Sequence, residues 1–379
     1  MYYIAYYTLP DDVRLSSPAA NAKIPVIAKA FADAGEKVEI ISTCTVVKDG
    51  VKGKIKGRSF KVDEGVECTQ FSTYATKKGW LRHLLYWLAN IKLFFKLLKV
   101  KKDEHICFYH AIERIPVIRL AKKIKKFKLI LEVEEIYANA SKLTDKEIKN
   151  EQEIFDLADA YIFSTELLNK QININNKPHA IIYGTYKVEE ELSQKQNDGK
   201  IHCVYAGTFD KLKGGCFAAV NAAEFLDKNY HVHIIGFGSE EDKKTLIDRI
   251  DDVSKKTDCT ITLDGLKQGE EYIKFIQSCH IGLSTQNPNG VFNTTSFPSK
   301  VLSYMANGLR VVSAKIDVLE TSKINDLMYY YEGDDPQSIA NAIMAIDVNE
   351  HYDSREKINE LYKNYKEEIK TVLIDIKNN

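Results

Sequence analysis

Short apolar runs alternate along the chain with longer segments whose apolar residues recur at helical spacing. Near the amino terminus, the β-rich run Tyr2 to Thr8 precedes a helical pattern from Ala20 to Ala34. Gly35 follows that pattern, and Lys37 to Ser42 forms the next apolar run. A strand, a helix, a glycine stop and another strand in this order predict the start of a parallel α/β sheet.

The same unit recurs through the first half of the chain. The pattern predicts strands at Cys68 to Tyr74, Ile106 to Tyr109, Leu129 to Val133 and Ala160 to Ser164. It predicts helices at Trp80 to Lys102, Ile115 to Lys125 and Asp145 to Ala158. This repetition indicates a Rossmann-like domain over residues 1–190.

The apolar period is lost between residues 183 and 201, which is typical of an interdomain linker. It then restarts, with expected strands at 202–206, 231–235, 260–263, 281–285 and 309–314 and helices at 214–226, 240–250, 270–278 and 299–307. We therefore expect a second Rossmann-like domain over 191–353. Residues 354–379 are expected to form a charged helix that crosses back to the first domain. Two such domains face each other across a cleft, where the carboxyl ends of both sheets bind ligands.

Composition excludes several classes of protein. Of the 379 residues, 44% are hydrophobic and 28% are charged, and no long polar tract occurs, so the chain is globular. The formal net charge is zero, which gives no indication of a nucleic-acid partner. Seven scattered cysteines without a C-x-x-C pair predict reduced thiols and no zinc site built on them.

The amino terminus lacks the basic and apolar regions of a signal peptide, and acids occur by Asp11. No segment has the roughly 18 to 20 uncharged apolar residues that a membrane span requires. These observations predict a cytoplasmic protein.

One stretch of the chain is strongly basic. Fifteen Lys or Arg residues stand against three acids between Lys77 and Lys128. Within it, Trp80 to Lys102 mixes aromatic, aliphatic and basic residues, as a helix lying on an anionic membrane surface would. A core helix whose lysines extend to solvent has the same composition. Both interpretations are open, and the first would make a lipid-linked glycan the natural acceptor.

Three segments after the linker contain residues suited to phosphate binding. The first, YAGTFDKLKGG, is a strand that leads into a glycine turn and a helix. Gly207, Thr208, Lys213 and Gly214 could surround a diphosphate there, since glycine admits close approach and lysine supplies charge. An ordinary turn with a solvated lysine would have the same residues.

The second segment, HIIGFGS, places Gly236 and Gly238 in a tight loop. It lacks the third glycine of a dinucleotide fingerprint, which argues against a nicotinamide dehydrogenase. The third, NTTSFPSKVLSYMANG, gathers hydroxyls at a helix start where Thr295 or Ser299 could act as a cap. Free N–H groups at that start could bind an anion, although such caps are also common at ordinary helices.

Together these segments resemble the retaining GT-B glycosyltransferases of family 4, also called group 1. YAGTFDKLKGG is similar to that family's glycine and lysine loop, HIIGFGSEED to its I-x-G-x-G-x-E element, and SFPSKVLSYMANGLRVVS to its F-P-S-K stretch. The resemblance covers the second half of the chain well and the first half loosely.

The resemblance implies a metal-independent transferase with no cofactor besides its nucleotide diphosphate sugar donor, and retention at the anomeric carbon. Lys213 would contact the diphosphate, Ser303 would lie at the donor ribose, and Leu266 would face the base. A loop would wrap the sugar and phosphates, and it comprises Thr295, Ser296, Phe297, Pro298, Ser299 and Lys300.

The sequence departs from the family pattern at four positions. Thr295 and Ser303 stand where the family commonly has two glutamates, and a neutral hydroxyl holds a ribose more weakly than a carboxylate does. Thr208 replaces a basic residue that is often found after the loop glycine. Glu134 stands where a histidine often ends a strand of the first domain.

Three residues of the first domain are candidates for catalysis. Glu134 and Glu135 follow one predicted strand and His110 follows another, at the edge expected to face the cleft. Each could orient an acceptor hydroxyl or act as a base. Each could equally serve only the structure, as a cap or a buried partner.

The sequence thus predicts transfer of a sugar from a nucleotide diphosphate sugar to a glycan or lipid-linked acceptor in surface polysaccharide synthesis. A non-catalytic GT-B subunit that binds carbohydrate or supports a partner is the alternative, because both family glutamates are absent. A sugar-nucleotide epimerase would require acids and a histidine clustered near the donor sugar, and the sequence offers no such set.

Overall fold

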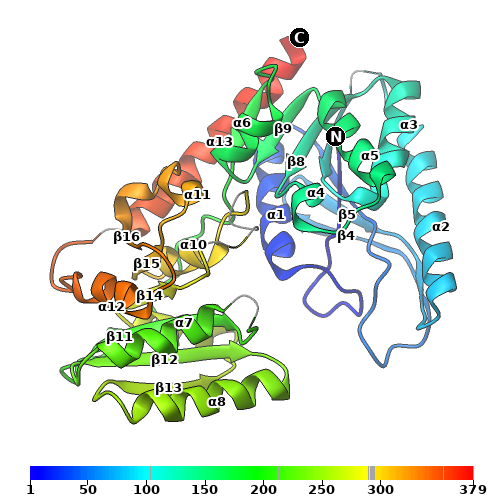
Figure 1. Cartoon of the computed structure of the whole chain (residues 1–379). Helices are drawn as coiled ribbons and strands as arrows, with labels where there is room; N and C mark the ends of the chain where they lie inside the picture. Colours follow the sequence, from blue (N-terminus) through cyan, green and yellow to red (C-terminus); the bar gives the residue numbers. More distant parts are fainter. Residues whose placement is uncertain (103, 212–213, 289, 291–294, 353, 379) are drawn as a thin grey trace. The chain divides into compact units, whose positions relative to one another are not determined.

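The computed structural model describes residues 1–379 except 103, 212–213, 289, 291–294, 353 and 379 (Figure 1). The chain forms two compact units. The first unit comprises Met1–Thr185 and Lys363–Asn379, and the second comprises Tyr186–Tyr362. Each contains a mainly or wholly parallel sheet with helices packed against it, so the predicted α/β class is confirmed.

The first unit is built on an eight-stranded sheet in the order β10-β9-β8-β7-β1-β2-β5-β4. Only β4 runs antiparallel to its neighbour, and a separate antiparallel pair joins β3 to β6. The strands are β1 (Tyr2–Ala5), β2 (Val38–Ser42), β3 (Gly53–Ile55), β4 (Arg58–Asp63), β5 (Val66–Gln70), β6 (Thr73–Ala75), β7 (His105–Tyr109), β8 (Lys128–Val133), β9 (Ala160–Phe163) and β10 (His179–Ile181).

Helices cover this sheet because its central strands are apolar on both faces. Phe108, Leu131 and Phe163 lie fully buried in one core cluster with Leu93 and Ile118 from the helices. The helices of the unit are α1 (Pro18–Asp33), α2 (Gly79–Leu97), α3 (Ile115–Lys125), α4 (Tyr137–Ala140), α5 (Asp145–Leu157) and α6 (Glu166–Ile172). Helix α13 (Ser354–Asn378) belongs to this unit from Lys363 onward, and its Lys366 pairs with Asp33 at 3.1 Å.

The pattern-based prediction missed β3, β4, β10, α4 and α6, and two of its expected elements have other bounds. The expected strand Cys68 to Tyr74 is divided into β5 and β6, and the Arg14 guanidinium donates to the Phe71 carbonyl oxygen, at 3.1 Å, between them. The expected helix Trp80 to Lys102 is α2, and it ends at Leu97.

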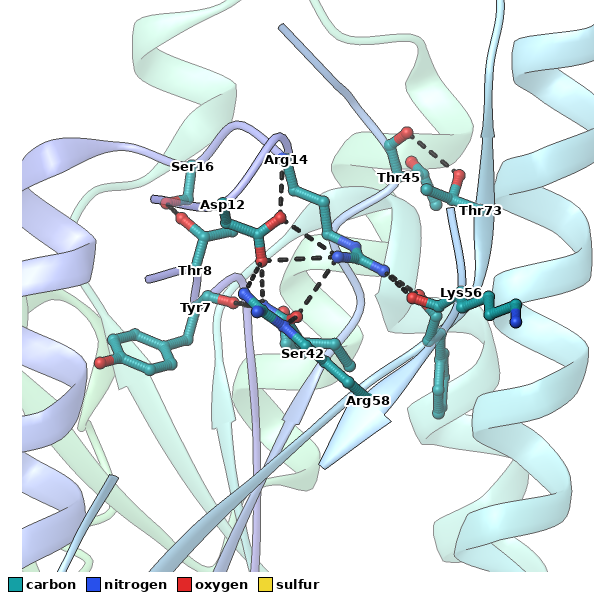
Figure 2. Close-up of polar contacts among 12 residues, drawn as sticks. Tyr7, Thr8, Asp12, Arg14, Ser16, Ser42, Thr45, Lys56, Arg58 and Thr73 are labelled. Atoms are coloured by element: carbon teal, nitrogen blue, oxygen red, sulfur yellow. Dashed lines mark hydrogen bonds and ion pairs between the residues drawn. The ribbon is translucent and has the colours of Figure 1, made fainter. Parts of the chain in front are cut away.

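A buried ionic network fixes the loop that follows β1 (Figure 2). The Asp12 carboxylate accepts hydrogen bonds from Arg14 at 3.2 Å, Arg58 at 2.8 Å and Gln70 at 2.8 Å. Only 2% of the Asp12 side chain is exposed, and its pKa lies below the ordinary value because these hydrogen bonds outweigh the effect of burial. The network thereby joins the loop to the β4 and β5 edge of the sheet.

Replacing Asp12 by alanine is expected to lower the free energy of unfolding of the first unit by about 3 kcal/mol, because it leaves the buried Arg14 without its carboxylate. Urea unfolding followed by tryptophan fluorescence measures this, since both tryptophans, Trp80 and Trp87, lie in the first unit. Asp11→Ala, at an exposed neighbouring position, is the matched control. Equal midpoints for the two variants would contradict a stabilising role for the network.

The second unit has a six-stranded parallel sheet in the order β13-β12-β11-β14-β15-β16. Its strands are β11 (Ile201–Thr208), β12 (Tyr230–Phe237), β13 (Thr260–Gly265), β14 (Ile281–Ser284), β15 (Arg310–Ala314) and β16 (Met328–Tyr331). Its helices are α7 (Gly215–Ala222), α8 (Glu240–Ser254), α9 (Gly269–Ser278), α10 (Ser299–Ala306), α11 (Asp317–Glu320) and α12 (Pro336–Met344). Figure 1 shows α7 and α8 lying along the strands β11 to β13.

Helix α2 carries an apolar stripe on its outer face. Five exposed apolar residues fall within a sector of about 100° when each residue turns the helix by about 100°, and they are Trp80, Leu84, Trp87, Leu88 and Phe95. The buried residues of α2 fall on the opposite side, and they are Ala89, Leu93 and Leu97. The helix therefore packs on the sheet with one face and presents a second apolar face outward. Among the described residues, the helices all fall short of the length and apolarity that crossing a membrane requires.

Candidate functional site

The carboxyl ends of β11 and β12 approach each other so closely that only glycine fits. A Cβ atom on Gly236 would lie 1.7 Å from the Gly207 carbonyl oxygen, and Gly236 has a φ of 142°. A Cβ on Gly207 would in turn lie 2.6 Å from the Lys300 amine. These two glycines therefore permit the strand ends and a lysine to meet at one point.

Lys300 is the cation at that point. Its Nζ donates to the Tyr205 hydroxyl at 2.8 Å and lies 4.0 Å from the centre of the Tyr205 ring. Tyr205 is 2% exposed, and burial raises the pKa of its hydroxyl. The tyrosine therefore stays neutral and holds the ammonium group in place without cancelling its charge.

Two helix starts border the same tyrosine. Helix α10 begins one residue before Lys300, and α7 begins at Gly215, whose Cβ would lie 2.8 Å from the Tyr205 ring. Neither helix has an acid in its first turn, and the N-cap residues, Gly214 and Pro298, supply no capping side chain. Helix starts carry partial positive charge and unpaired N–H groups. This edge of the sheet is therefore suited to an anion such as a diphosphate.

Most of the remaining predicted donor residues lie just before α10 or on it. Thr295 is buried, Ser296, Phe297 and Pro298 are half-buried, and Ser299 is exposed. Ser303 is half-buried on α10, and its hydroxyl lies 3.1 Å from the Tyr272 hydroxyl. Lys213 lies outside the described residues.

The glycine loops occupy the positions that the motifs predict. Thr208 ends β11, and Gly214 caps α7 with a φ of 67°. Gly238 packs against Phe209, since its Cβ would lie 2.8 Å from the Phe209 Cβ. Leu266 follows β13 and is 51% exposed.

The structure adds Tyr304 and Thr285, which sequence reasoning did not select. The Tyr304 hydroxyl accepts from the Ala206 amide at 2.9 Å, and the Thr285 hydroxyl donates to the Gly215 carbonyl at 2.7 Å. Both residues are buried. They position the strand end and the helix start that carry the site. Their place in apolar runs gave no indication of this role, because a buried tyrosine in such a run looks like core.

In the first unit, Glu134 forms an ion pair. Its carboxylate lies 2.5 Å from the Lys23 Nζ of α1, and Lys23 also donates to the Ile182 carbonyl at 2.8 Å. Glu132, fully buried beneath it, lies 3.7 Å from the same amine. Burial raises the pKa of Glu132. Lys23 is thus shared by two carboxylates at the end of β8.

Glu135 and His110 lie beside this group without joining it. The pKa of Glu135 is raised, first by partial burial and then by the Glu134 charge. His110 is 2% exposed, with Nε2 3.5 Å from a Glu151 oxygen and its ring packed against Tyr137 and Phe155. Burial lowers the pKa of His110 to about 4. The catalytic roles of Glu134, Glu135 and His110 stay predictions.

Replacing His110 by glutamine is expected to flatten the pH dependence of stability between pH 4 and 6.5. The pKa of His110 is about 4 in the fold against an ordinary 6.5, so on acidification the unfolded chain takes up the proton first. Its contribution is complete above pH 6.5 and declines by about 3 kcal/mol towards pH 4. Urea unfolding at several pH values measures the difference between wild type and variant. Parallel curves would contradict the expected shift.

The part of the chain that contains this site is similar to a known protein family. Residues 200–346 match the family described as Glycosyl transferases group 1. That segment includes both glycine loops, Lys300 and helix α10. No curated protein sequence matches the chain.

Solved structures match over nearly the whole chain. The trehalose 6-phosphate synthase of Burkholderia multivorans has a TM-score of 0.63 at 10% identity, covering 100% of this chain and 96% of its own. Sucrose-phosphate synthase of Thermosynechococcus elongatus has 0.59 at 16%, covering 97% and 94%. Anabaena HepE, in complex with UDP and glucose, has 0.61 at 12%, covering 96% and 94%. The similarity establishes the GT-B fold that the sequence predicted.

Proposed function

We propose that this chain, whose residues 200–346 form a domain of the group 1 glycosyltransferase family, transfers a sugar from a nucleotide diphosphate sugar to a hydroxyl acceptor. The observation that carries the proposal is the cation at the end of β11. Lys300, the starts of two helices and a glycine pair meet there. A departing diphosphate needs such a positive environment in the transition state.

The protein's part in the reaction is electrostatic. Lys300 and the N–H groups at the starts of α7 and α10 would bind the diphosphate and stabilise the charge that develops as the glycosidic bond breaks. Lys213 would add a second positive charge, as its place in the glycine loop suggests. We also propose that the transfer retains the configuration at the anomeric carbon and needs no metal ion. Both points rest on the family resemblance.

Ser303 and Thr295 are expected to weaken binding of the donor, because they replace the two glutamates of the family pattern. Where a glutamate could hold the donor ribose, α10 has the Ser303 hydroxyl, paired with Tyr272. A neutral hydroxyl offers a weaker hydrogen bond to ribose than a carboxylate does. We therefore expect donor affinity to rest mainly on the diphosphate, and the nucleotide base to be contacted near Leu266.

Calorimetric titration with UDP, GDP and ADP tests the donor half of the proposal, and release of nucleotide from UDP-glucose tests turnover. UDP-glucose is the first probe because a structural neighbour was solved with UDP and glucose. Binding with turnover supports a transferase. Binding without turnover, even with added acceptor sugars, would favour the non-catalytic subunit. Absence of binding to all three nucleotides would overturn the transferase.

We further propose that the acceptor is a glycan or a lipid-linked glycan of surface polysaccharide synthesis. The protein would bind an anionic membrane surface to meet it. This proposal is supported by the outward apolar stripe of α2, which includes Trp80, Trp87 and Phe95. The region of α3 and the start of β8 adds a hollow lined by five basic residues, Arg119, Lys122, Lys123, Lys126 and Lys128, and by Asp159, which pairs with Lys122. Aromatic side chains beside clustered cations are the features by which a surface helix binds anionic lipid.

The double variant Trp80→Ser and Trp87→Ser is expected to lose at least about tenfold in affinity for vesicles of phosphatidylglycerol and phosphatidylcholine, because it removes the largest apolar side chains of the stripe. Co-sedimentation at low salt measures it. Ile174→Ser, at a position 78% exposed elsewhere in the first unit, is the control. If wild type does not bind these vesicles, the membrane part of the proposal fails, and the stripe is then a protein-binding surface.

A further inference from the structure

Three histidine rings gather on one face of the second unit's sheet. A fourth, His280, stacks on His202 with ring centroids 5.8 Å apart, and its Nδ1 accepts a hydrogen bond from the His202 amide at 3.0 Å, so that nitrogen is already occupied. His202 lies at the start of β11, and His231 and His233 lie on β12. His202 stands opposite His231 in the parallel register, and side chains two residues apart share a face of the sheet. One nitrogen from each of the three rings lies within 4.8 Å of the others.

The hydrogen bonds of Thr262 and Asp264 assign the ring protons of His231 and His233. The Thr262 hydroxyl donates to an Asp264 carboxylate oxygen at 2.8 Å, so it must accept from His231 Nε2 at 3.0 Å. The same carboxylate oxygen accepts from His233 Nδ1 at 3.0 Å. The nitrogens left without a proton are therefore Nδ1 of His231 and Nε2 of His233.

Asp198 makes the equivalent assignment for His202. Its carboxylate accepts a hydrogen bond from His202 Nε2 at 2.9 Å, which leaves Nδ1 of His202 without a proton. That nitrogen faces the unprotonated Nε2 of His233 at 2.9 Å. Two lone pairs repel each other at this distance unless a cation lies between or beside them. The candidates for that cation are a proton and a metal ion.

We propose that His202, His231 and His233 form a binding site for a first-row transition-metal ion of the Zn²⁺ class. All three rings direct an N–H to an oxygen acceptor and keep the other nitrogen for a ligand bond, an arrangement in which carboxylates orient metal-binding imidazoles. Imidazole nitrogens favour Zn²⁺, Cu²⁺ or Ni²⁺ over Mg²⁺ or Ca²⁺. Solvent would complete the coordination, as at other three-histidine zinc sites.

Two of the rings already bring their ligand nitrogens close together. With zinc–nitrogen bonds of about 2.1 Å, two nitrogens 2.9 Å apart subtend roughly a right angle at the metal. A small separation of His202 and His233 widens this toward the tetrahedral value. His231 must change more, because its ring is stacked on His233 with centroids 3.8 Å apart. It is also the most exposed of the three rings, so its side chain has the most freedom to turn.

This site is separate from the donor edge. His202 is the second residue of β11 and Gly207 the seventh, so the strand places them about 16 Å apart along its length. His233 lies three residues before Gly236 on β12, about 10 Å from it along the strand. The metal would therefore join the amino-terminal halves of β11 and β12 and lie away from the diphosphate edge. The inference is independent of the proposed function.

Equilibrium dialysis of the metal-stripped chain without an affinity tag, against Zn²⁺ alone and against Mg²⁺ alone, tests the proposal. We expect one Zn²⁺ per chain, a dissociation constant in the micromolar range or below, and no retention of Mg²⁺. Saturating Zn²⁺ should also raise the Tm by about 5 °C, because it binds the folded chain. X-ray absorption of the zinc-loaded protein should show imidazole nitrogens at about 2.0 Å.

The matched variants are His231→Asn, which removes the most exposed ligand, and His351→Asn, an exposed histidine elsewhere in the second unit. His231→Asn is expected to weaken Zn²⁺ binding at least tenfold, and His351→Asn to leave it unchanged. Circular dichroism establishes that both variants fold. Failure of the wild type to retain Zn²⁺, or equal retention by both variants, would overturn the proposal and assign the cation between His202 and His233 as a proton.

Discussion

Replacing Lys300 by alanine is expected to lower the rate of sugar transfer by about a thousandfold while the protein remains folded. The ammonium group sits over the Tyr205 ring at the start of α10, where a diphosphate would bind. Loss of one preorganised charged group at a site of developing charge typically costs about a hundredfold to a thousandfold in rate. Steady-state kinetics with the donor identified by titration measures it.

Lys274→Ala is the control for this prediction, because Lys274 is an exposed lysine on α9 paired only with Glu270 among the contacts of the described residues. Its kinetics should equal those of wild type. Lys300→Arg should recover part of the activity, since it keeps the charge but not the shape of the amine. If Lys300→Ala retains full transfer activity, the diphosphate binds elsewhere and the site described around Tyr205 is wrong.

Replacing Gly236 by alanine is expected to lower the free energy of unfolding of the second unit by about 4 to 5 kcal/mol. The new Cβ would lie 1.7 Å from a backbone oxygen of Gly207, and the φ of 142° is unfavourable for any other residue. Relief requires the separation of β11 from β12. Urea unfolding followed by circular dichroism, which reports both units, measures the loss.

Gly269→Ala separates backbone strain from steric contact. Gly269 also has a positive φ, of 54°, but its Cβ would meet nothing within 4 Å. We expect it to cost about 1 kcal/mol, as a residue in the left-handed region does. If the two alanine variants were equally stable, the close approach of the strands at Gly207 would not be required, and the glycine pair would lose its structural explanation.

The elements of the second unit were largely predictable from sequence. Five of its parallel strands are short apolar runs, such as His202 to Ala206, and four of its helices show a helical period, because burial between two helical layers imposes those patterns. The prediction missed β16, α11 and α12, which follow residue 314. The bounds of α10 were also predictable, from Pro298 and Ser299 at its start and the glycine at 308 after its end. The predicted cap at Thr295 or Ser299 was wrong, because the N-cap is Pro298 and Ser299 is the first helical residue. Strand boundaries in the first unit were less predictable. The run after Cys68 is divided where it contacts Arg14, which lies far away in sequence.

The candidate site was predictable in position but not in composition. The motifs placed Gly207, Gly236 and Lys300 at one edge of a sheet, since the carboxyl ends of parallel strands meet there. They did not select Tyr205 or Tyr304, because a buried tyrosine has the same sequence pattern whether it fills a core or holds a lysine.

Sequence alone therefore determined the α/β class, the order of the elements and the edge at which an anion could bind, because these depend on local periodicity and on short motifs. Tertiary structure decided which side chains share a partner. It paired Glu134 with Lys23, set Lys300 over Tyr205 and brought together His202 and His233, which are 31 residues apart. Such pairings depend on strand register and helix packing, which local patterns do not encode.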